Sequence, residues 1–182
     1  IDTIVCTILA VDPNACLNSA LAARYPREIT AAVMLMLRIT GATRAISVID
    51  DRLPNNWLTQ LRRLTRKTGH RLVTLHNDYP QADPTILLYT LLSRRLRPGR
   101  LPSEQGVLLF DAAAALAIGR AALSQEAMTL TPMVVRDHTA LRSEYAFAPV
   151  AMKIFDALRQ LSIDAGDRVI RRGDVLRDLR VA

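Results

Sequence analysis

The feature that most constrains the fold of this chain is an alternation of short apolar segments with segments of helical spacing. Apolar runs rich in β-branched residues are typical of strands buried on both faces, and Pro, Gly and acidic residues flank the segments between them as they flank helices. Strand-helix-strand units require parallel strands with right-handed crossovers, so the sequence predicts a three-layer α/β domain with a mainly parallel sheet. The expected strands are 3–11, 44–50, 71–76 and 107–110, and the expected helices are 26–40, 55–68, 85–95 and one from 112 onward.

The segment Leu101–Leu123, LPSEQGVLLFDAAAALAIGRAAL, places an acid at a junction between a strand and a helix. A turn at Pro102 and Gly106 precedes the apolar run Val107–Phe110, and Asp111 separates that run from a helix of small residues. In open α/β folds such junctions bring backbone N–H groups to the carboxyl edge of the sheet, where ligands bind. A carboxylate there repels phosphate. The sequence therefore predicts a site at this junction. The acid at its edge makes anion binding there unfavourable.

The sequence predicts a second, smaller domain over residues 127–182, following the first domain over 1–126. The regular alternation stops near Ala127, and β-branched residues punctuated by Pro follow it. A unit of about 50 residues is too small to be robust alone, so we expect an α+β appendage packed on the main domain. Its expected elements are one or two exposed strands within 127–137, another strand at 145–147, a helix opened by Pro149 and ended by residues 164–166, and a strand at 168–170.

The positive charge of the chain comes almost wholly from arginine. The net charge is +7, and Lys67 and Lys153 are the only lysines among the 182 residues. Arginine clusters bind nucleic acid, anionic lipid or acidic proteins, but few aromatic side chains are interleaved here to stack on bases. The sequence therefore predicts no nucleic-acid partner. The clusters are Arg62, Arg63 and Arg66, then Arg94, Arg95, Arg97 and Arg100, then Arg168, Arg171, Arg172, Arg177 and Arg180.

Other classes of protein are disfavoured by what the chain contains. No apolar run approaches the about 18 residues that span a bilayer, so we expect a cytoplasmic protein. Cys6 and Cys16 are too few for a cysteine-ligated cluster and are expected to be structural. His76 and Asp78 lack a third metal ligand, and Asp50-Asp51 is interpreted as a helix-capping pair. No metal and no catalytic residue is assigned.

Four segments of the chain follow one another in a characteristic order and spacing. They are YPQ at 79–81, LLYTLLSRRL at 87–96, LPSEQGVLLFDAAAALAIGRAAL at 101–123 and DAGDRVIRRG at 164–173. Together they resemble the C subunit of the Rnf electron-transport complex, which is related to the flavin-bearing subunit of respiratory complex I and to the cobalamin reductase of propanediol-using microcompartments. The resemblance implies a Rossmann-like flavin domain over 1–126, a β-grasp domain of the SLBB type over 127–182, and a peripheral place at the inner membrane through a complex.

The resemblance implies a cofactor site at Asp12, Tyr79, Gln81 and Asp111. We expect Asp50 to join Asp12, Tyr79 and Asp111 at the carboxyl edge of the sheet, because each follows a predicted parallel strand.

The chain departs from the family at several of these positions. Thr7 and Ala10 stand where the family has Asn and Glu, Ala82-Asp83-Pro84 replaces GGE after YPQ, and Asp111 replaces Asn. The Gly-rich loop of the family would precede the first matched strand, and we expect that this chain begins after it or never had it.

Two hypotheses follow for the function. In the first, the chain is a module of an electron-transport subunit, with flavin mononucleotide (FMN) as the family's cofactor and other subunits of the complex as partners. In the second, it is a scaffold or interaction subunit derived from the same fold. The missing glycines and the added acids predict that the chain alone binds no cofactor. Arg94, Arg95, Arg97 and Arg100 are then candidate contacts to an acidic neighbouring subunit.

Overall fold

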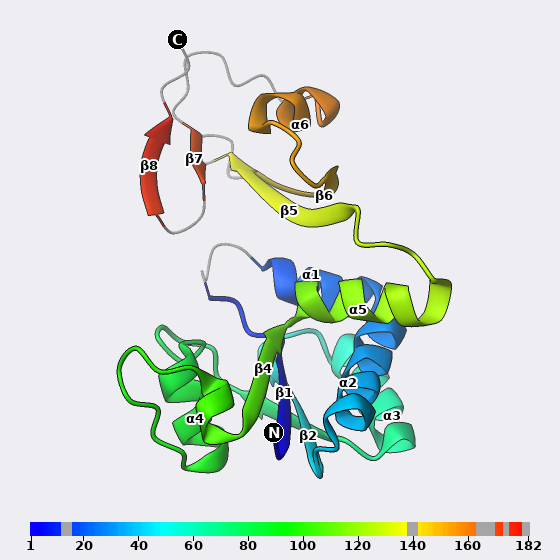
Figure 1. The fold of residues 1–182 in the computed structure, drawn as a ribbon. Coiled ribbons are helices and arrows are strands. Elements are labelled where there is room, and N and C mark those ends of the chain that lie inside the picture. Colours follow the sequence, from blue (N-terminus) through cyan, green and yellow to red (C-terminus); the bar gives the residue numbers. More distant parts are fainter. Residues whose placement is uncertain (12–15, 138–141, 163–169, 173–174, 180–182) are drawn as a thin grey trace. The chain divides into compact units, whose positions relative to one another are not determined.

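The structure, a computed structural model, describes residues 1–11, 16–137, 142–162, 170–172 and 175–179 (Figure 1). Asp12, one of the expected site residues, lies outside the described residues. The chain divides into two compact units, Ile1–Met128 and Thr129–Ala182, which are described separately below. None of the described helices is long and apolar enough to cross a membrane.

The first unit is built on a four-stranded parallel sheet in the order β3-β2-β1-β4. β1 lies between its two neighbours in register, with Val5 opposite Ile46 on one side and Leu109 on the other. Val5 and its neighbours Ile4 and Cys6 have no exposed surface, as a strand covered on both faces requires. The strands are β1 (Thr3–Thr7), β2 (Arg44–Asp50), β3 (Arg71–Leu75) and β4 (Val107–Asp111).

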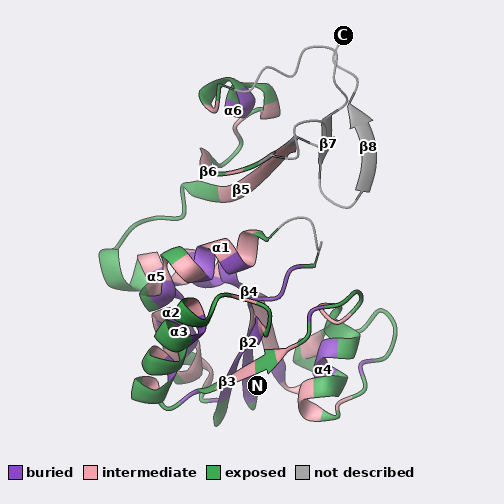
Figure 2. Cartoon of the chain, turned by 180° about the vertical axis from the view of Figure 1, so that it is seen from behind, coloured by how far each residue is buried: buried purple, intermediate pink, exposed green. Residues whose placement is uncertain are grey.

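Helices cover both faces of this sheet, so the predicted three-layer Rossmann-like α/β fold is confirmed. Figures 1 and 2 show α2 and α3, with α5 against α2, on one side of the sheet and α4 on the other. The cluster under α4 joins Leu87 and Leu88 to Val5, Val48 and Val107 of the sheet. The helices are α1 (Leu17–Arg24), α2 (Pro26–Thr40), α3 (Asn55–Thr68), α4 (Pro84–Leu92), α5 (Ala112–Ser124) and a 3-10 turn, η1 (Pro102–Gln105).

The small residues of α5 allow it to lie directly on the backbone of α2. A Cβ added at Gly119 would lie 2.0 Å from the carbonyl oxygen of Glu28. Ala115 and Leu116 of the same helix are buried. The run of small residues after Asp111 is therefore a requirement of helix packing.

The ends of the first strand and of α4 differ most from expectation, whereas the ends of β3 and β4 differ by one residue. The predicted strand 3–11 ends at Thr7, although Ile8, Leu9 and Ala10 remain buried and the Ile8 amide still donates to the Val48 carbonyl at 2.8 Å. α4 ends at Leu92 rather than near 95. An apolar run indicates that a segment is buried. It does not show where the hydrogen-bonded strand ends and a buried, non-strand continuation begins.

The second unit begins with an antiparallel hairpin, β5 (Leu130–Asp137) paired with β6 (Arg142–Pro149). Pro149 ends β6 instead of opening a helix, which corrects the sequence interpretation, and α6 (Ile154–Gln160) begins five residues later. A second antiparallel pair joins β7 (Ile170–Arg172) and β8 (Val175–Leu179). The predicted helix end at 164–166 lies outside the described residues.

Candidate functional site

The strand order creates a switch point between β1 and β4. From β1 the chain adds β2 and β3 on one side and then crosses to place β4 on the other. At the carboxyl ends of the central pair, Thr7 is the register partner of Asp111. Open α/β sheets bind ligands in the crevice outside such a reversal, so this edge is the candidate site.

The side chain of Asp111 caps the N-terminus of α5. It is the N-cap residue, and its carboxylate oxygen Oδ1 accepts the Ala114 amide at 2.8 Å. The side chain is exposed, and the sequence placed it correctly at the end of a strand. Burial, and secondarily the charge of Asp111, raise the pKa of the Cys6 thiol, which therefore remains protonated and unreactive. A negative group thus sits where the helix would otherwise offer free donors to an anion.

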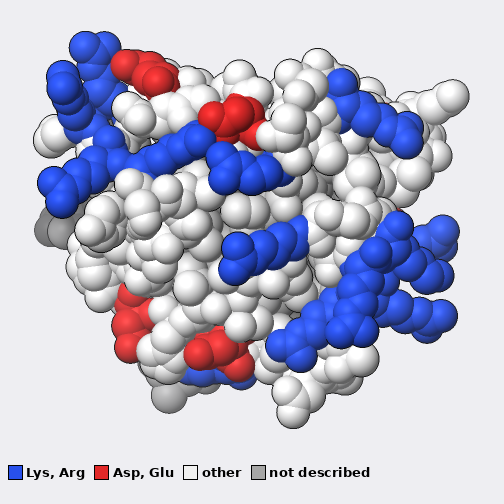
Figure 3. Space-filling model, turned by 90° about the horizontal axis from the view of Figure 1, so that it is seen from below, with Lys and Arg blue, Asp and Glu red and all other residues white. Residues whose placement is uncertain are grey.

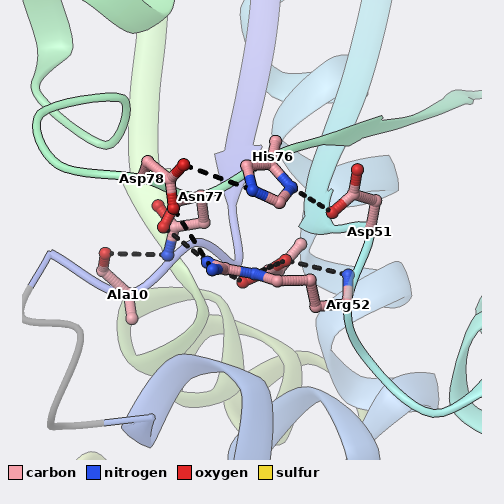
Figure 4. A network of polar contacts seen from close by, with 7 residues as sticks. Ala10, Asp51, Arg52, His76, Asn77 and Asp78 are labelled. Atoms are coloured by element: carbon pink, nitrogen blue, oxygen red, sulfur yellow. Dashed lines mark hydrogen bonds and ion pairs between the residues drawn. The ribbon is translucent and has the colours of Figure 1, made fainter.

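The edge next to β2 and β3 is filled by a network around Arg52 (Figure 4). The guanidinium donates twice to Asp50, both contacts measuring 3.1 Å, once to Asp78 at 3.2 Å and once to the Asn77 carbonyl at 2.6 Å. Burial raises the pKa of Asp50, but the hydrogen bonds from Arg52 outweigh it and leave that pKa below its usual value. Arg52 therefore joins the loops that follow β2 and β3.

His76 lies between two carboxylates in the same network. Its Nδ1 is 3.1 Å from Asp51 and its Nε2 is 3.2 Å from Asp78. The interpretation of Asp50-Asp51 as a helix-capping pair is wrong, because the N-cap position of α3 is Pro54 and carries no side-chain cap. Asp50 instead accepts hydrogen bonds from Arg52, and Asp51 lies against the His76 ring. Within the described residues, no three His, Cys, Asp or Glu side chains are arranged to hold a metal ion.

Asn77 ties this network to the loop after β1. The side chain is buried, with 7% of its surface exposed, and its Nδ2 donates to the Ala10 carbonyl at 3.0 Å. Sequence reasoning missed both Asn77 and Arg52. The signal available for Asn77 was the run of polar residues directly after β3, at the edge where parallel strands end together. No local pattern marked Arg52 as a link between two loops, because two of its three partner residues, Asn77 and Asp78, lie 25 and 26 residues further along the chain.

The residues that the resemblance implied do not form one cluster. Tyr79 is 86% exposed in the loop after β3. Gln81 donates through Nε2 to the Thr90 hydroxyl at 3.2 Å, which fixes it against α4. Among the described residues, no hydrogen bond or ion pair joins Tyr79, Gln81 and Asp111.

A sequence model of the Nuo51 FMN-binding domain matches residues 1–120. The chain belongs to this family. No curated protein sequence matches the chain.

Solved structures of an NAD+-reducing NiFe hydrogenase share the fold. The H2-reduced form superposes with a TM-score of 0.72 at 16% identity over 92% of this chain, and the air-oxidized form with 0.69 at 15% identity over 87%. The matched region is 34% and 32% of those chains, so this chain spans about a third of their length.

The described residues at the candidate site do not fit the phosphate of FMN. Phosphate sites on this kind of fold use glycines that let the backbone approach and a helix N-terminus with free N–H groups. Of the glycines in the described part of the chain, Gly41 and Gly69 end helices, Gly99 and Gly106 precede β4, and Gly119 packs on α2. None of these lies at the carboxyl edge, and Asp111 already caps α5.

Proposed function

We propose that this chain is a module of an electron-transport subunit of the Rnf C type. The match of residues 1–120 to the Nuo51 FMN-binding domain supports the redox class, and the order of the four quoted segments supports the narrower assignment. In this proposal residues 1–126 are the flavin-domain scaffold and 127–182 an SLBB-like β-grasp domain. The module works beside other subunits of the complex, which supply the redox centres.

The proposed module does not bind FMN by itself. The observation that carries this part is the hydrogen bond from the Ala114 amide to Asp111, which places a carboxylate on the helix that begins at the switch point. The FMN phosphate carries about two negative charges. An acid about 6 Å away, at an effective dielectric near 20, costs about 3 kcal/mol per pair of unit charges, which is roughly a hundredfold in affinity.

A second candidate is a scaffold or interaction subunit with no part in electron transfer. The network around Arg52 favours it, because internal ion pairs occupy the edge next to β2 and β3. Both candidates predict an isolated chain without flavin. They differ in the assembled complex, where the first requires a redox centre close to this module and the second does not.

The proposal is tested by titrating the purified chain with FMN. We expect colourless protein and no quenching of FMN fluorescence below high-micromolar protein. Flavin absorbance in the purified chain, or quenching at low micromolar protein, would contradict it.

A matched pair of variants separates the two causes of weak binding. Asp83 caps α4 as Asp111 caps α5, accepting the Thr85 amide at 2.8 Å. If Asp111→Asn binds FMN and Asp83→Asn does not, the carboxylate alone disables the site. If neither variant binds, the missing glycines are the cause, and the proposal stands in either case.

A further inference from the structure

Helix α3 turns an uninterrupted row of cations to solvent. Arg62, Arg63, Arg66 and Lys67 are exposed, and the residues between them, Leu64 and Thr65, face inward. Leu58 and Leu61 on the inward side are buried in the core. The helix contains no Asp or Glu anywhere between Asn55 and Thr68, so no charge on its own surface balances these four.

Neighbouring elements extend this row along the amino edge of the sheet. Arg38 near the end of α2 and Arg71 at the start of β3 are both exposed, and α2 and α3 pack side by side. Figure 3 views this side and shows a dense group of basic side chains at its lower right, on the side of α2 and α3. We call the set the amino-edge basic face; its members are Arg38, Arg62, Arg63, Arg66, Lys67 and Arg71.

The members of this face are available for a partner, as far as ion pairs among the described residues show. In the part of the chain that the structure describes, none of them makes an ion pair. The arginines that follow α4 differ. Arg94 donates to Asp2 at 2.8 Å and to the Gln105 carbonyl at 2.6 Å, Arg100 pairs with Glu104 at 3.1 Å, and Arg95 lies over the Tyr89 ring. The cluster that the sequence nominated for partner binding is therefore largely engaged internally.

The spacing of the cations on α3 causes electrostatic repulsion along the helix, which a bound anion would relieve. Arg62 and Arg66, and likewise Arg63 and Lys67, are like charges four residues apart, a spacing at which side chains are neighbours and repel. The helix dipole favours cations only in the last turn, which holds Arg66 and Lys67 but not the other pair. A partner of opposite charge removes the repulsion at every one of these positions.

We propose that the amino-edge basic face docks an acidic segment of a partner polypeptide, rich in Asp and Glu. The inference rests on the proposed function, in which the module works inside an assembly. Guanidinium groups bind carboxylates through two parallel hydrogen bonds, and charge complementarity steers such partners together.

Two other anionic partners fit this face less well. Single-stranded nucleic acid needs aromatic side chains for stacking, and the aromatic residue of α3, Trp57, is half-buried in the first turn at the other end of the helix. A membrane surface needs a helix whose apolar side faces outward, and the apolar side of α3 is turned into the core.

The test uses a fluorescein-labelled peptide of glutamates and the full chain, followed by fluorescence anisotropy at low salt. The variant R62Q/R63Q/R66Q/K67Q removes the charges of α3. The control R24Q/R27Q/K153Q/R159Q removes equal charge from exposed positions elsewhere. We expect the first variant to weaken peptide binding by about tenfold or more and the control by less than about threefold. A double variant, R62Q/R63Q, should give an intermediate loss and guards against misfolding of the fourfold variant.

Three results would overturn the proposal. Equal losses in the fourfold variant and its control would mean that net charge alone attracts the peptide. Tighter binding of a DNA duplex, or of phosphatidylglycerol vesicles, than of the peptide would mean that the partner class is wrong. The FMN titration is independent of these measurements, because the face lies at the opposite edge of the sheet from Asp111. Failure of the docking proposal therefore leaves the flavin result intact, and the reverse holds as well.

Discussion

The two edges of the parallel sheet carry opposite charges and use them differently. At the carboxyl edge, Asp50, Asp51 and Asp78 bind Arg52 and His76, and Asp111 caps a helix. At the amino edge, the cations of α3 stand without ion pairs among the described residues. At the edge where this fold ordinarily binds ligands, the acids are thus engaged in contacts within the fold, and the other edge keeps cations without ion pairs among the described residues.

A charged side chain can therefore lie at the edge where ligands usually bind and still be unavailable to a ligand, because contacts within the fold already engage it. Asp2, at the amino edge, is engaged in the same way. Its carboxylate accepts a hydrogen bond from the Arg94 guanidinium, and this bond is the main cause that lowers the pKa of Asp2 to about 2. The basic side chains of α3 form no such ion pair with any of the described residues.

The largest effect is expected from Gly119→Ala, because α5, the helix that Asp111 caps at the carboxyl edge, packs at Gly119 directly on the backbone of α2. Helix propensity alone would make alanine more stable by about 1 kcal/mol. The Glu28 carbonyl at 2.0 Å from the added Cβ reverses this, and we expect a loss of about 3 kcal/mol in the free energy of unfolding. Urea denaturation followed by circular dichroism measures it. Ala122→Gly, at an exposed site on α5, should cost no more than about 1 kcal/mol.

The next effect concerns His70, which is buried at the amino edge between Ser47 and Thr68. Burial lowers its pKa to about 4 from the ordinary 6.5. The unfolded chain therefore takes up the proton first as the pH falls, and stability present above pH 6.5 is lost toward pH 4. Between pH 7 and pH 5 we expect a loss of about 2 kcal/mol that His70→Gln removes. Identical pH profiles for the two proteins would contradict a neutral, buried His70.

Arg52→Gln tests whether the carboxyl edge depends on its ion pairs. The change leaves the Asp50 carboxylate, whose side chain is 15% exposed, without the guanidinium. We expect a loss of about 1.5 kcal/mol in the free energy of unfolding. Arg44→Gln is the matched change at the amino edge, where Arg44 is 58% exposed and 3.8 Å from Asp2, and it should cost less than about 0.5 kcal/mol. Equal costs for the two variants would remove the contrast between the edges.

The smallest effect on stability is expected from R62Q/R63Q/R66Q/K67Q. Removing like charges four residues apart should leave the free energy of unfolding unchanged or raise it by a few tenths of a kcal/mol at low salt. The gain should disappear at high salt, where such repulsion is screened. A clear loss of stability at low salt would mean that these cations have partners within the fold.

Much of the architecture could be predicted from local patterns. Pro26 and Gly41 bound α2 as expected, Gly69 ends α3, and the acid at 111 lies at the end of its strand. These features depend on a residue and its immediate neighbours, so they can be predicted from the sequence alone. The errors arose where the same residue type has two uses. Pro149 ends a strand, and Asp50 and Asp51 contact Arg52 and His76 instead of capping α3.

The sequence by itself determined the alternation of strands and helices, and hence an α/β fold with a parallel sheet. Only the tertiary structure decided the order β3-β2-β1-β4, the contact of Gly119 with Glu28, and the meeting of Arg52 with Asp78. The physical reason is one of distance along the chain. Propensity, capping and apolar periodicity act over a few residues, whereas these contacts join residues that come together only when helices and strands pack. The basic face of α3 depends on both. The sequence determines the row of cations, and among the described residues the fold places no acid within ion-pair distance of it.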